Sequence, residues 1–469
     1  MVFNSLQYAV FLPFVVLLHW ALPARFRLTL IVFASYVFYG SWDWRFLSLL
    51  VISTLVDFTV GDRLHREVSH DKRRLWLLLS IVVNLGILGA FKYSNFFVDS
   101  AVDLLNGAGL GPNEPLLRVI LPVGISFYTF QTLSYTIDIY RGRIEPTKSL
   151  ITFAAYVAYF PQLVAGPIER AQRLLPQLEA ERHSPDLARV QSGVGLILLG
   201  LIKKVVLADT MAPLVQTAFT DPDSQGSVAL AVGVLAFAVQ IYGDFSGYSD
   251  IARGSSRLLG IELVVNFRQP YLSENITDFW RRWHISLSDW LRDYLYIPLG
   301  GNRGGQVRTY RNLMLTMLIG GLWHGASWNF VVWGGLHGGY LAVHRLLRDR
   351  VPAREHPPMA TRVGAWAFTF ALVNLAWVFF RADSFDQAFS VVSGLMAVRG
   401  GMPPIEDLIL VLFGLGGTAL IDLILQSRLD LPREAVRHPI GAGVGVGLGL
   451  VGLVLFSGST VVPFIYFQF

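Results

Sequence analysis

Apolar residues occur in long runs along most of the chain, and short polar segments separate them. The runs lie near 2–22, 27–42, 46–61, 75–91, 118–138, 149–166, 188–219, 228–249, 312–343, 363–381, 386–397, 405–425 and 438–466. A helix needs roughly 20 predominantly apolar residues to cross a bilayer, and many of the runs come near that length. The pattern therefore predicts an all-α polytopic membrane protein with about 11 to 13 membrane helices, re-entrant segments included.

The composition agrees with this prediction and excludes a water-soluble enzyme. Only 15% of the residues are charged and 53% are hydrophobic, whereas a soluble domain carries roughly a quarter charged residues. The first apolar run, Val2 to Leu22, has no basic segment before it, so no cleavable signal peptide is expected. Cysteine is absent, which excludes a thiolate nucleophile. The modest net charge of +5 indicates basic cytoplasmic loops and no nucleic-acid partner.

Basic loops predict the orientation of the chain. The segments Arg63–Arg74, Tyr140–Lys148 and Arg253–Arg311 are rich in arginine and lysine and are expected on the cytoplasmic side. No soluble domain or long linker interrupts the apolar pattern, so residues 1–469 are predicted to form a single membrane domain.

Two apolar segments are predicted to be broken within the membrane. Gly320 to Gly338 has arginines on both sides, which argues against a single crossing and favours two half-spans that meet at a glycine-rich turn. Phe160 to Arg170 is interrupted by two prolines and a glycine. Broken backbone at that depth is tolerated only where protein or water surrounds it, so both breaks point to an enclosed polar site.

The segment from Asn275 to Gly305 predicts a helix that lies in the membrane interface. Its aromatic and leucine side chains recur at spacings of three and four, and they are Phe279, Trp280, Trp283, Leu287, Trp290, Leu291 and Tyr294. Arg281 and Arg282 fall on the polar side. On residue chemistry alone they are better explained as contacts to anionic lipid, and the alternative is that they receive a phosphate-bearing donor. His284, taken alone, is more typical of a structural histidine than of a catalyst.

Buried carboxylates are expected where the run near 228–249 ends. Asp244 and Asp250 lie at or inside the membrane, where a carboxylate lines a polar cavity or pairs with a cation. Arg253 is a candidate partner. Asp244 is explained equally well as one half of a structural ion pair and as a residue of the functional site.

Two histidines, His324 and His337, lie within the uncharged stretch from Gly320 to Gly338. A histidine in an apolar span is a functional hypothesis by default, because its neutral ring can act as a general base. On one continuous helix the two rings would be about 20 Å apart, whereas a break near Gly325 would let them line one tunnel at different depths. Their spacing and the lack of nearby carboxylates argue against a metal site.

Two classes of function fit these residues. One is an enzyme that moves a group within the membrane with an intramembrane histidine as base. The other is a proton-coupled secondary transporter that uses a histidine and Asp244. A transporter should show internal repeats with paired broken helices, and the sequence contains none, which favours the enzyme.

Several motifs resemble those of bacterial membrane-bound O-acyltransferases, most closely the group of alginate O-acetyltransferase membrane subunits. They are LPVGISFYTFQTLSYTIDIYRG, FPQLVAGPIER, FWRRWHISLSDWLRDYLYIPLGGNRGG, LIGGLWHGASWNFVVWGGLHG and WVFFRA. They run in order from Leu121 to Ala382 and define a core over about residues 118–382. The resemblance implies a funnel-shaped helical bundle in the bacterial inner membrane.

The resemblance also implies a reaction and a site. An acyl group, expected to be acetyl, would pass from a cytoplasmic thioester donor to a hydroxyl of a cell-surface polysaccharide such as alginate, with an exported transferase as partner. The donor would be acetyl-CoA or a phosphopantetheine carrier, and no bound cofactor or metal is expected. D-alanyl transfer to teichoic acid is the alternative.

The family pattern assigns the chemistry to His324, the histidine of the WHG motif. His337 matches the same motif as a second catalytic histidine, and His284 of the RWH motif, together with Asp244, is expected on the substrate side. Trp323 and Trp328 are expected to close a dry tunnel around His324, and the helix of Arg281 and Arg282 to receive the donor.

Overall fold

The computed structural model describes residues 1–111, 118–164, 166–180, 184, 187–350, 357–427, 439–456 and 464–465. Within these ranges the secondary structure is helical, with no strand, so the all-α prediction is confirmed. The chain divides by packing into two compact units. The first holds Met1–Arg189 and Ser255–Leu263, and the second holds Val190–Gly254 and Val264–Phe469. This division does not test the single domain predicted over residues 1–469.

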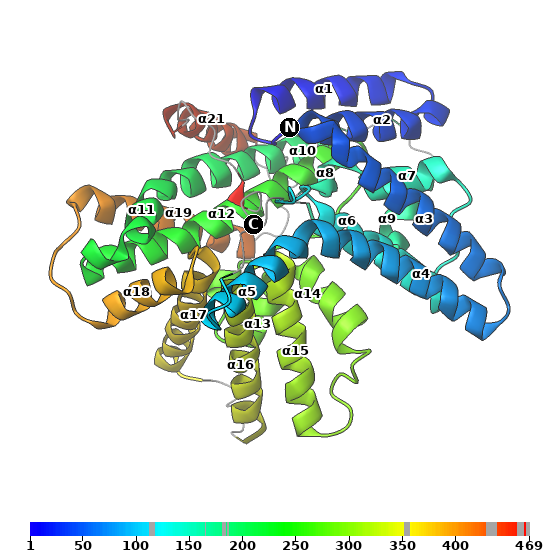
Figure 1. Ribbon diagram of the computed structural model, residues 1–469. Coiled ribbons are helices and arrows are strands. Elements are labelled where there is room, and N and C mark those ends of the chain that lie inside the picture. The colour runs from blue at the N-terminus through cyan, green and yellow to red at the C-terminus, as the bar shows by residue number, and fades with distance from the viewer. Residues whose placement is uncertain are drawn as a thin grey trace. The chain divides into compact units, whose positions relative to one another are not determined.

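The described residues of the first unit form nine complete α-helices, one 3₁₀ turn and one π-helix, and the unit also takes in the start of α10 and the end of α12 (Figure 1). They are α1 (Leu6–Ala21), α2 (Ala24–Asp43), the 3₁₀ turn η1 (Trp44–Phe46), α3 (Leu47–Arg66), α4 (His70–Leu88), the π-helix η2 (Gly89–Tyr93), α5 (Ser94–Gly107), α6 (Ile125–Tyr140), α7 (Leu150–Ala158), α8 (Phe160–Leu163) and α9 (Ala171–Glu179). The predicted break within Phe160–Arg170 is confirmed, because α8 ends after four residues and none of the described residues between Leu163 and Ala171 is helical.

The second unit contains His324 and His337, the two histidines of the stretch from Gly320 to Gly338. Its elements are most of α10 (Leu187–Leu201), the π-helix η3 (Ile202–Ala208), α11 (Asp209–Thr220), η4 (Pro222–Ser224), most of α12 (Ser227–Leu258), η5 (Pro270–Leu272), α13 (Ile276–Arg282), α14 (Ile285–Leu291), the π-helix η6 (Arg292–Tyr296), α15 (Gln306–His324), α16 (Trp328–Arg350), α17 (Met359–Arg381), α18 (Phe385–Met396), α19 (Ile405–Ser427) and α21 (Pro439–Phe456).

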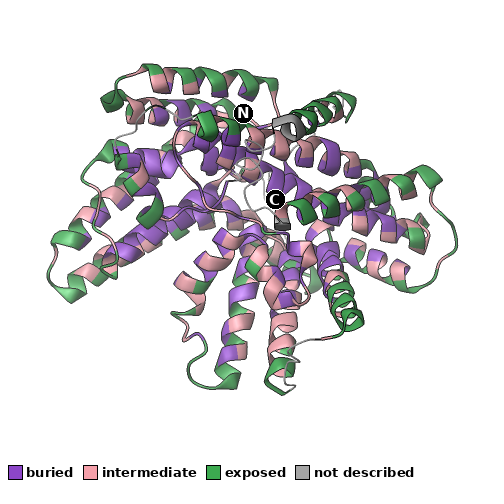
Figure 2. Cartoon of the chain, turned by 180° about the vertical axis from the view of Figure 1, so that it is seen from behind, coloured by how far each residue is buried: buried purple, intermediate pink, exposed green. Residues whose placement is uncertain are grey.

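Six helical segments in the described chain are long and apolar enough to cross a membrane. They are Ala24–Arg66, His70–Gly107, Leu187–Thr220, Ser227–Leu258, Met359–Arg381 and Ile405–Leu425, and three shorter apolar helices accompany them. The protein is therefore a polytopic membrane protein. Long segments are fewer than the apolar runs of the sequence because neighbouring runs join through η1, as 27–42 and 46–61 do. Exposed valines and leucines cover α21, at the upper right of Figure 2, as expected for a helix that faces lipid.

The predicted break near Gly325 is confirmed as a helical hairpin. Helix α15 ends at His324 and α16 begins at Trp328, so the two helices run side by side (Figure 1). Glycine permits their close approach: a Cβ on Gly321 would lie 2.1 Å from the carbonyl oxygen of Phe330, and one on Gly334 would lie 2.3 Å from that of Met317. The hairpin therefore depends on backbone contact between α15 and α16.

Candidate active site

The hairpin brings His324 and His337 into one aromatic cluster. Both rings are buried, and Trp333 lies between them, with ring centroids 5.0 Å from His324 and 4.8 Å from His337. On a continuous helix a single indole could not contact both rings. The break at Gly325 therefore lets one indole contact both histidines, and a tunnel that they line at different depths stays a prediction.

His284 joins this cluster from a different part of the chain. Its ring centroid lies 6.2 Å from that of His324 and 4.7 Å from that of Phe245 on α12. The segment Asn275–Gly305 does not form the single helix predicted for it, because His284 adopts a left-handed conformation (φ 42°) and separates α13 from α14. The corner turns the imidazole toward α15, which a straight interfacial helix would not do.

Asn266 stabilises this corner, and the sequence analysis missed it. Its Oδ1 accepts hydrogen bonds from the backbone N–H of Ser286 at 3.2 Å and from the Ser286 hydroxyl at 2.9 Å. The same oxygen lies 3.2 Å from Nδ1 of His284. Because an amide oxygen only accepts hydrogen bonds, Nδ1 of His284 must carry the proton. The lone pair of His284 is therefore on Nε2.

His337 has the opposite tautomer. The indole N–H of Trp280, on α13, donates to Nδ1 of His337 at 3.2 Å. A ring nitrogen that accepts a hydrogen bond carries no proton, so His337 is neutral with its proton on Nε2. His337 is thus a hydrogen-bond donor at Nε2, whereas His284 is an acceptor at Nε2.

The aromatic wall around His324 differs from the prediction at one tryptophan. Trp323 is buried and its ring lies 5.1 Å from that of His324. Trp328 was expected to wall the ring as well, but its side chain begins α16 and is 53% exposed. Trp333 and Phe380, at 5.0 and 5.4 Å, take that place. Trp328, the first residue of α16, faces outward, whereas Trp333 faces the buried side of the same helix.

The two arginines of α13 lie at its last turn and differ in their partners. Arg282 pairs with Asp278 at 2.9 Å, one turn earlier in α13. Arg281 is exposed. The same helix carries Trp280, so α13 links this basic edge to His337.

Asp244 pairs with a lysine, whereas Arg253, the cation predicted for Asp244 and Asp250, pairs with Asp250. The Oδ1 of Asp244 lies 2.9 Å from Nζ of Lys204, which also pairs with Asp209 at 2.7 Å. Its Oδ2 accepts a hydrogen bond from the backbone N–H of Ile465 at 2.6 Å. Arg253 instead lies 3.6 Å from Asp250. Lys204 was not predicted from the sequence, although Lys203 and Lys204 lie inside an apolar run, where a lysine indicates a buried charge.

Close packing of α12 against the end of α10 and η3 brings these charged side chains together. A Cβ on Gly247 of α12 would lie 2.6 Å from the carbonyl oxygen of Gly200, and one on Gly243 would lie 2.8 Å from that of Lys203. The π-helix η3 carries Lys203 and Lys204 at this contact, and Lys203 pairs with Asp250 at 2.7 Å. Phe245, next to Asp244 in α12, is the residue that contacts His284. Asp244 therefore lies beside the wall of the histidine cluster and does not enter the ring contacts.

The described residues contain no group of three or more His, Cys, Asp or Glu side chains placed to hold a metal ion. The arrangement instead brings together the buried rings of His284 and His324 and the hydrogen-bond donor His337. Indole and phenyl rings surround them. Such a site can take a proton from a hydroxyl while it excludes water.

Comparison with known proteins bears on the chemistry. Residues 144–382 match the model of the membrane-bound O-acyltransferase family. A probable alginate O-acetylase of Azotobacter vinelandii is 45% identical over 85% of this chain and 78% of its own length. A peptidoglycan O-acetyltransferase of Helicobacter pylori is 37% identical over 83% of this chain and 77% of its own. A teichoic acid D-alanyltransferase of Streptococcus thermophilus is 31% identical over 46% of this chain and 55% of its own.

Proposed function

This chain belongs to the membrane-bound O-acyltransferase family, and from that premise we propose that it passes an acetyl group from a cytoplasmic thioester donor across the membrane toward a cell-surface polysaccharide, by way of an acceptor hydroxyl on an exported transferase. The observation that carries the proposal is the enclosed cluster of His284, His324 and His337 with its aromatic walls. The similar proteins from Azotobacter vinelandii and Helicobacter pylori are named as acetylases of alginate and peptidoglycan, which supports acetyl as the group and a surface glycan as the acceptor.

His324 acts as the general base in this proposal. It takes the proton of the acceptor hydroxyl while the hydroxyl oxygen attacks the thioester carbonyl carbon. The carbon–sulfur bond then breaks, and the proton moves from His324 to the departing thiolate, so an ester and a free thiol result. No cysteine in the chain is available to hold the acyl group, so transfer from donor to acceptor needs no thioester on this protein.

The other two histidines have different roles because their tautomers differ. His337, protonated at Nε2 by virtue of its bond to Trp280, donates a hydrogen bond to the oxygen that gains negative charge in the transition state. His284, with its lone pair on Nε2, accepts a hydrogen bond and helps to orient the hydroxyl. Buried rings around His324 exclude the water that would hydrolyse the thioester.

The donor, the partner and the compartment follow from the same proposal. Acetyl-CoA or a phosphopantetheine carrier supplies the thioester, and the exposed guanidinium of Arg281 suits its phosphate. An exported transferase receives the acyl group and completes its delivery to the polysaccharide. The protein works in the bacterial inner membrane, with Arg253–Arg311 on the cytoplasmic side.

The proposal is tested by analysis of surface glycans in a deletion strain. The strain is complemented with the wild-type chain, with His324→Ala or with His65→Ala, whose ring is exposed on α3. We expect acetyl esters with the wild type and His65→Ala and none with His324→Ala at equal membrane abundance. Full acetylation with His324→Ala would contradict the assignment of His324 as the general base. D-alanyl esters in place of acetyl would overturn the acetyl donor, and an uptake defect with normal acylation in the deletion strain would favour a transporter.

A further inference from the structure

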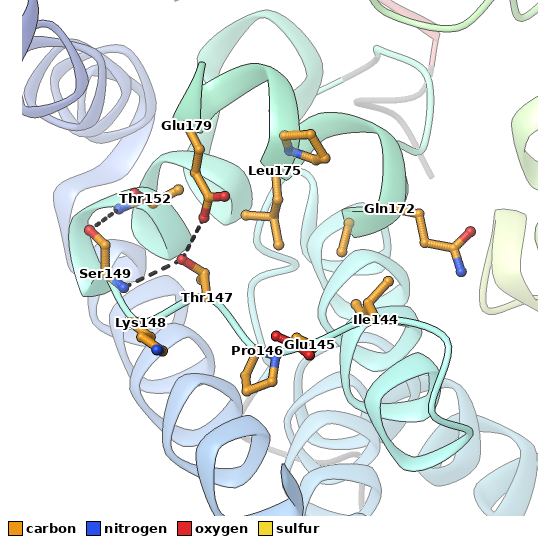
Figure 3. A pocket seen from close by; sticks show the side chains of 12 residues that line it. Ile144, Glu145, Pro146, Thr147, Lys148, Ser149, Thr152, Gln172, Leu175 and Glu179 are labelled. Carbon is orange, nitrogen blue, oxygen red and sulfur yellow. Dashed lines mark hydrogen bonds between the residues drawn. The ribbon is translucent and has the colours of Figure 1, made fainter. Parts of the chain in front are cut away.

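The first unit contains a pocket whose lining residues are separate from those of the histidine cluster. It has a volume of about 580 Å³ and is bounded by the loop from Ile144 to Ser149 and by α9. Figure 3 shows Leu175 of α9 projecting toward this loop, with Glu145 and Pro146 across the gap. The volume falls within the range of small-molecule sites.

Hydrogen bonds hold the inner wall of the pocket. The hydroxyl of Thr147 donates to Oε1 of Glu179 at 2.8 Å and so joins the loop to α9. Ser149 caps α7, since its Oγ accepts from the backbone N–H of Thr152 at 3.2 Å (Figure 3). These two hydrogen bonds hold the loop from Ile144 to Ser149 against α7 and α9.

Three polar side chains at the pocket are left available. Glu145, Lys148 and Gln172 are lining residues, and in the part of the chain that the structure describes they have no hydrogen-bond or ion-pair partner. Glu179 adds a second carboxylate. The apolar part of the lining comes from Ile144, Pro146, Ala171, Leu175 and Pro176. The pocket thus offers one ammonium group, two carboxylates and an apolar floor.

The surroundings of the pocket have the features of a membrane interface. Leu150 and Ile151, the first residues of α7, are 42% and 48% exposed. Helix α9 buries Leu174 and Leu178 and exposes Arg173, as a helix that lies in the interface does. The basic loop Tyr140–Lys148 is typical of the cytoplasmic surface. The pocket therefore opens at the depth of the lipid headgroups.

We propose that this pocket binds the headgroup of a phospholipid that carries a primary amine. The Lys148 ammonium pairs with the phosphate, and the carboxylates of Glu145 and Glu179 accept hydrogen bonds from the amine. Ile144, Pro146 and Leu175 contact the glycerol and the first carbons of the acyl chains. A purely anionic headgroup would meet two carboxylates, and a quaternary amine has no N–H to donate to them. The inference does not depend on acyl transfer.

The test measures which lipid the purified full chain retains. The protein is delipidated in detergent and incubated with an equimolar mixture of phosphatidylethanolamine, phosphatidylglycerol and phosphatidylcholine, and bound lipid is counted by native mass spectrometry. We expect enrichment of phosphatidylethanolamine. Lys148→Gln should lower retention of all three lipids, and Glu145→Gln should lower only the preference for phosphatidylethanolamine, each by up to about fivefold for exposed charge pairs.

Arg173→Gln is the matched control, because Arg173 lies on α9 but does not line the pocket, and it should retain lipid as the wild type does. Equal retention of phosphatidylglycerol, or variants at positions 145 and 148 that behave as the control, would overturn the proposal. A second arm adds phosphorylethanolamine, which has the same headgroup without acyl chains. Displacement of lipid at concentrations comparable to those of the lipid itself would overturn the assignment to lipid and point to a soluble aminophosphate.

Discussion

The indole Nε1 of Trp280 lies 3.2 Å from Nδ1 of His337. This bond joins α13 to α16 and determines which nitrogen of a fully buried imidazole carries the proton. Because Trp280 is a donor only, His337 cannot offer Nδ1 as a base while the bond is intact. The relationship separates His337, a donor, from His324, the proposed base.

Trp280→Phe should lower kcat without preventing insertion. Phenylalanine keeps a ring against His337 but removes the N–H, and one lost hydrogen bond changes a rate by about two- to tenfold. His337→Gln, whose amide can still donate, should retain more activity than His337→Ala. The measurement is the initial rate of acyl transfer by purified variants. Equal rates for His337→Gln and His337→Ala would contradict the donor role.

Asn266→Ala should destabilise the corner between α13 and α14. The substitution leaves the N–H groups of Ser286 and His284 without their acceptor, which costs about 1–3 kcal/mol of unfolding free energy for buried donors. Asn266→Asp keeps an acceptor oxygen and should lose less. Thermal unfolding in detergent measures the stability and the initial rate reports the orientation of His284. The hypothesis is contradicted if the alanine variant is as stable and as active as the wild type.

Gly321→Ala should disrupt the hairpin, whereas Gly339→Ala should not. A Cβ at Gly321 would lie 2.1 Å from the carbonyl oxygen of Phe330, while one at Gly339 would meet no described atom within 4 Å. Overpacking of this kind costs about 1–3 kcal/mol, and replacing an unhindered helical glycine by alanine gains up to about 1 kcal/mol. In thermal unfolding we expect a lower midpoint for Gly321→Ala. We expect an unchanged or higher midpoint for Gly339→Ala. Similar midpoints for both would mean that the α15–α16 contact is looser than the distances indicate.

Lys204→Met should be more harmful than the double variant Lys204→Met, Asp244→Asn. The single change leaves the carboxylates of Asp244 and Asp209 without their cation, and an unpaired buried charge costs about 3–5 kcal/mol. Asparagine removes one of those charges and still offers an oxygen to the backbone N–H of Ile465. Folded yield and unfolding midpoint give the comparison. A double variant no more stable than the single one would show that Lys204 acts through something other than this pair.

The helical class and the two breaks were predictable because they depend on local pattern. Runs of apolar residues define the helices, and arginines on both flanks with glycine between them predicted the turn at Gly325. The WHG motif directed attention to His324, which lies in the buried cluster. Its catalytic role stays a prediction.

What escaped prediction depends on contacts between distant segments. Asn266 and His284 are 18 residues apart and meet only because the chain turns at a left-handed histidine, which periodicity treats as one more helical position. Trp328 and Trp333 are alike in a motif, yet one is 53% exposed and the other 0%. Arg253 was predicted as the cation for Asp244 and Asp250, and it pairs with Asp250. Asp244 instead pairs with Lys204, which the helix packing at Gly243 and Gly247 brings near it.

The backbone contact between α15 and α16 has a mechanical consequence. At Gly321 and Gly334 no side chain separates the two helices, so nothing between them can change rotamer to let them slide or part. The hairpin is therefore expected to move as one rigid unit, so that His324 at the end of α15 and His337 within α16 keep their spacing.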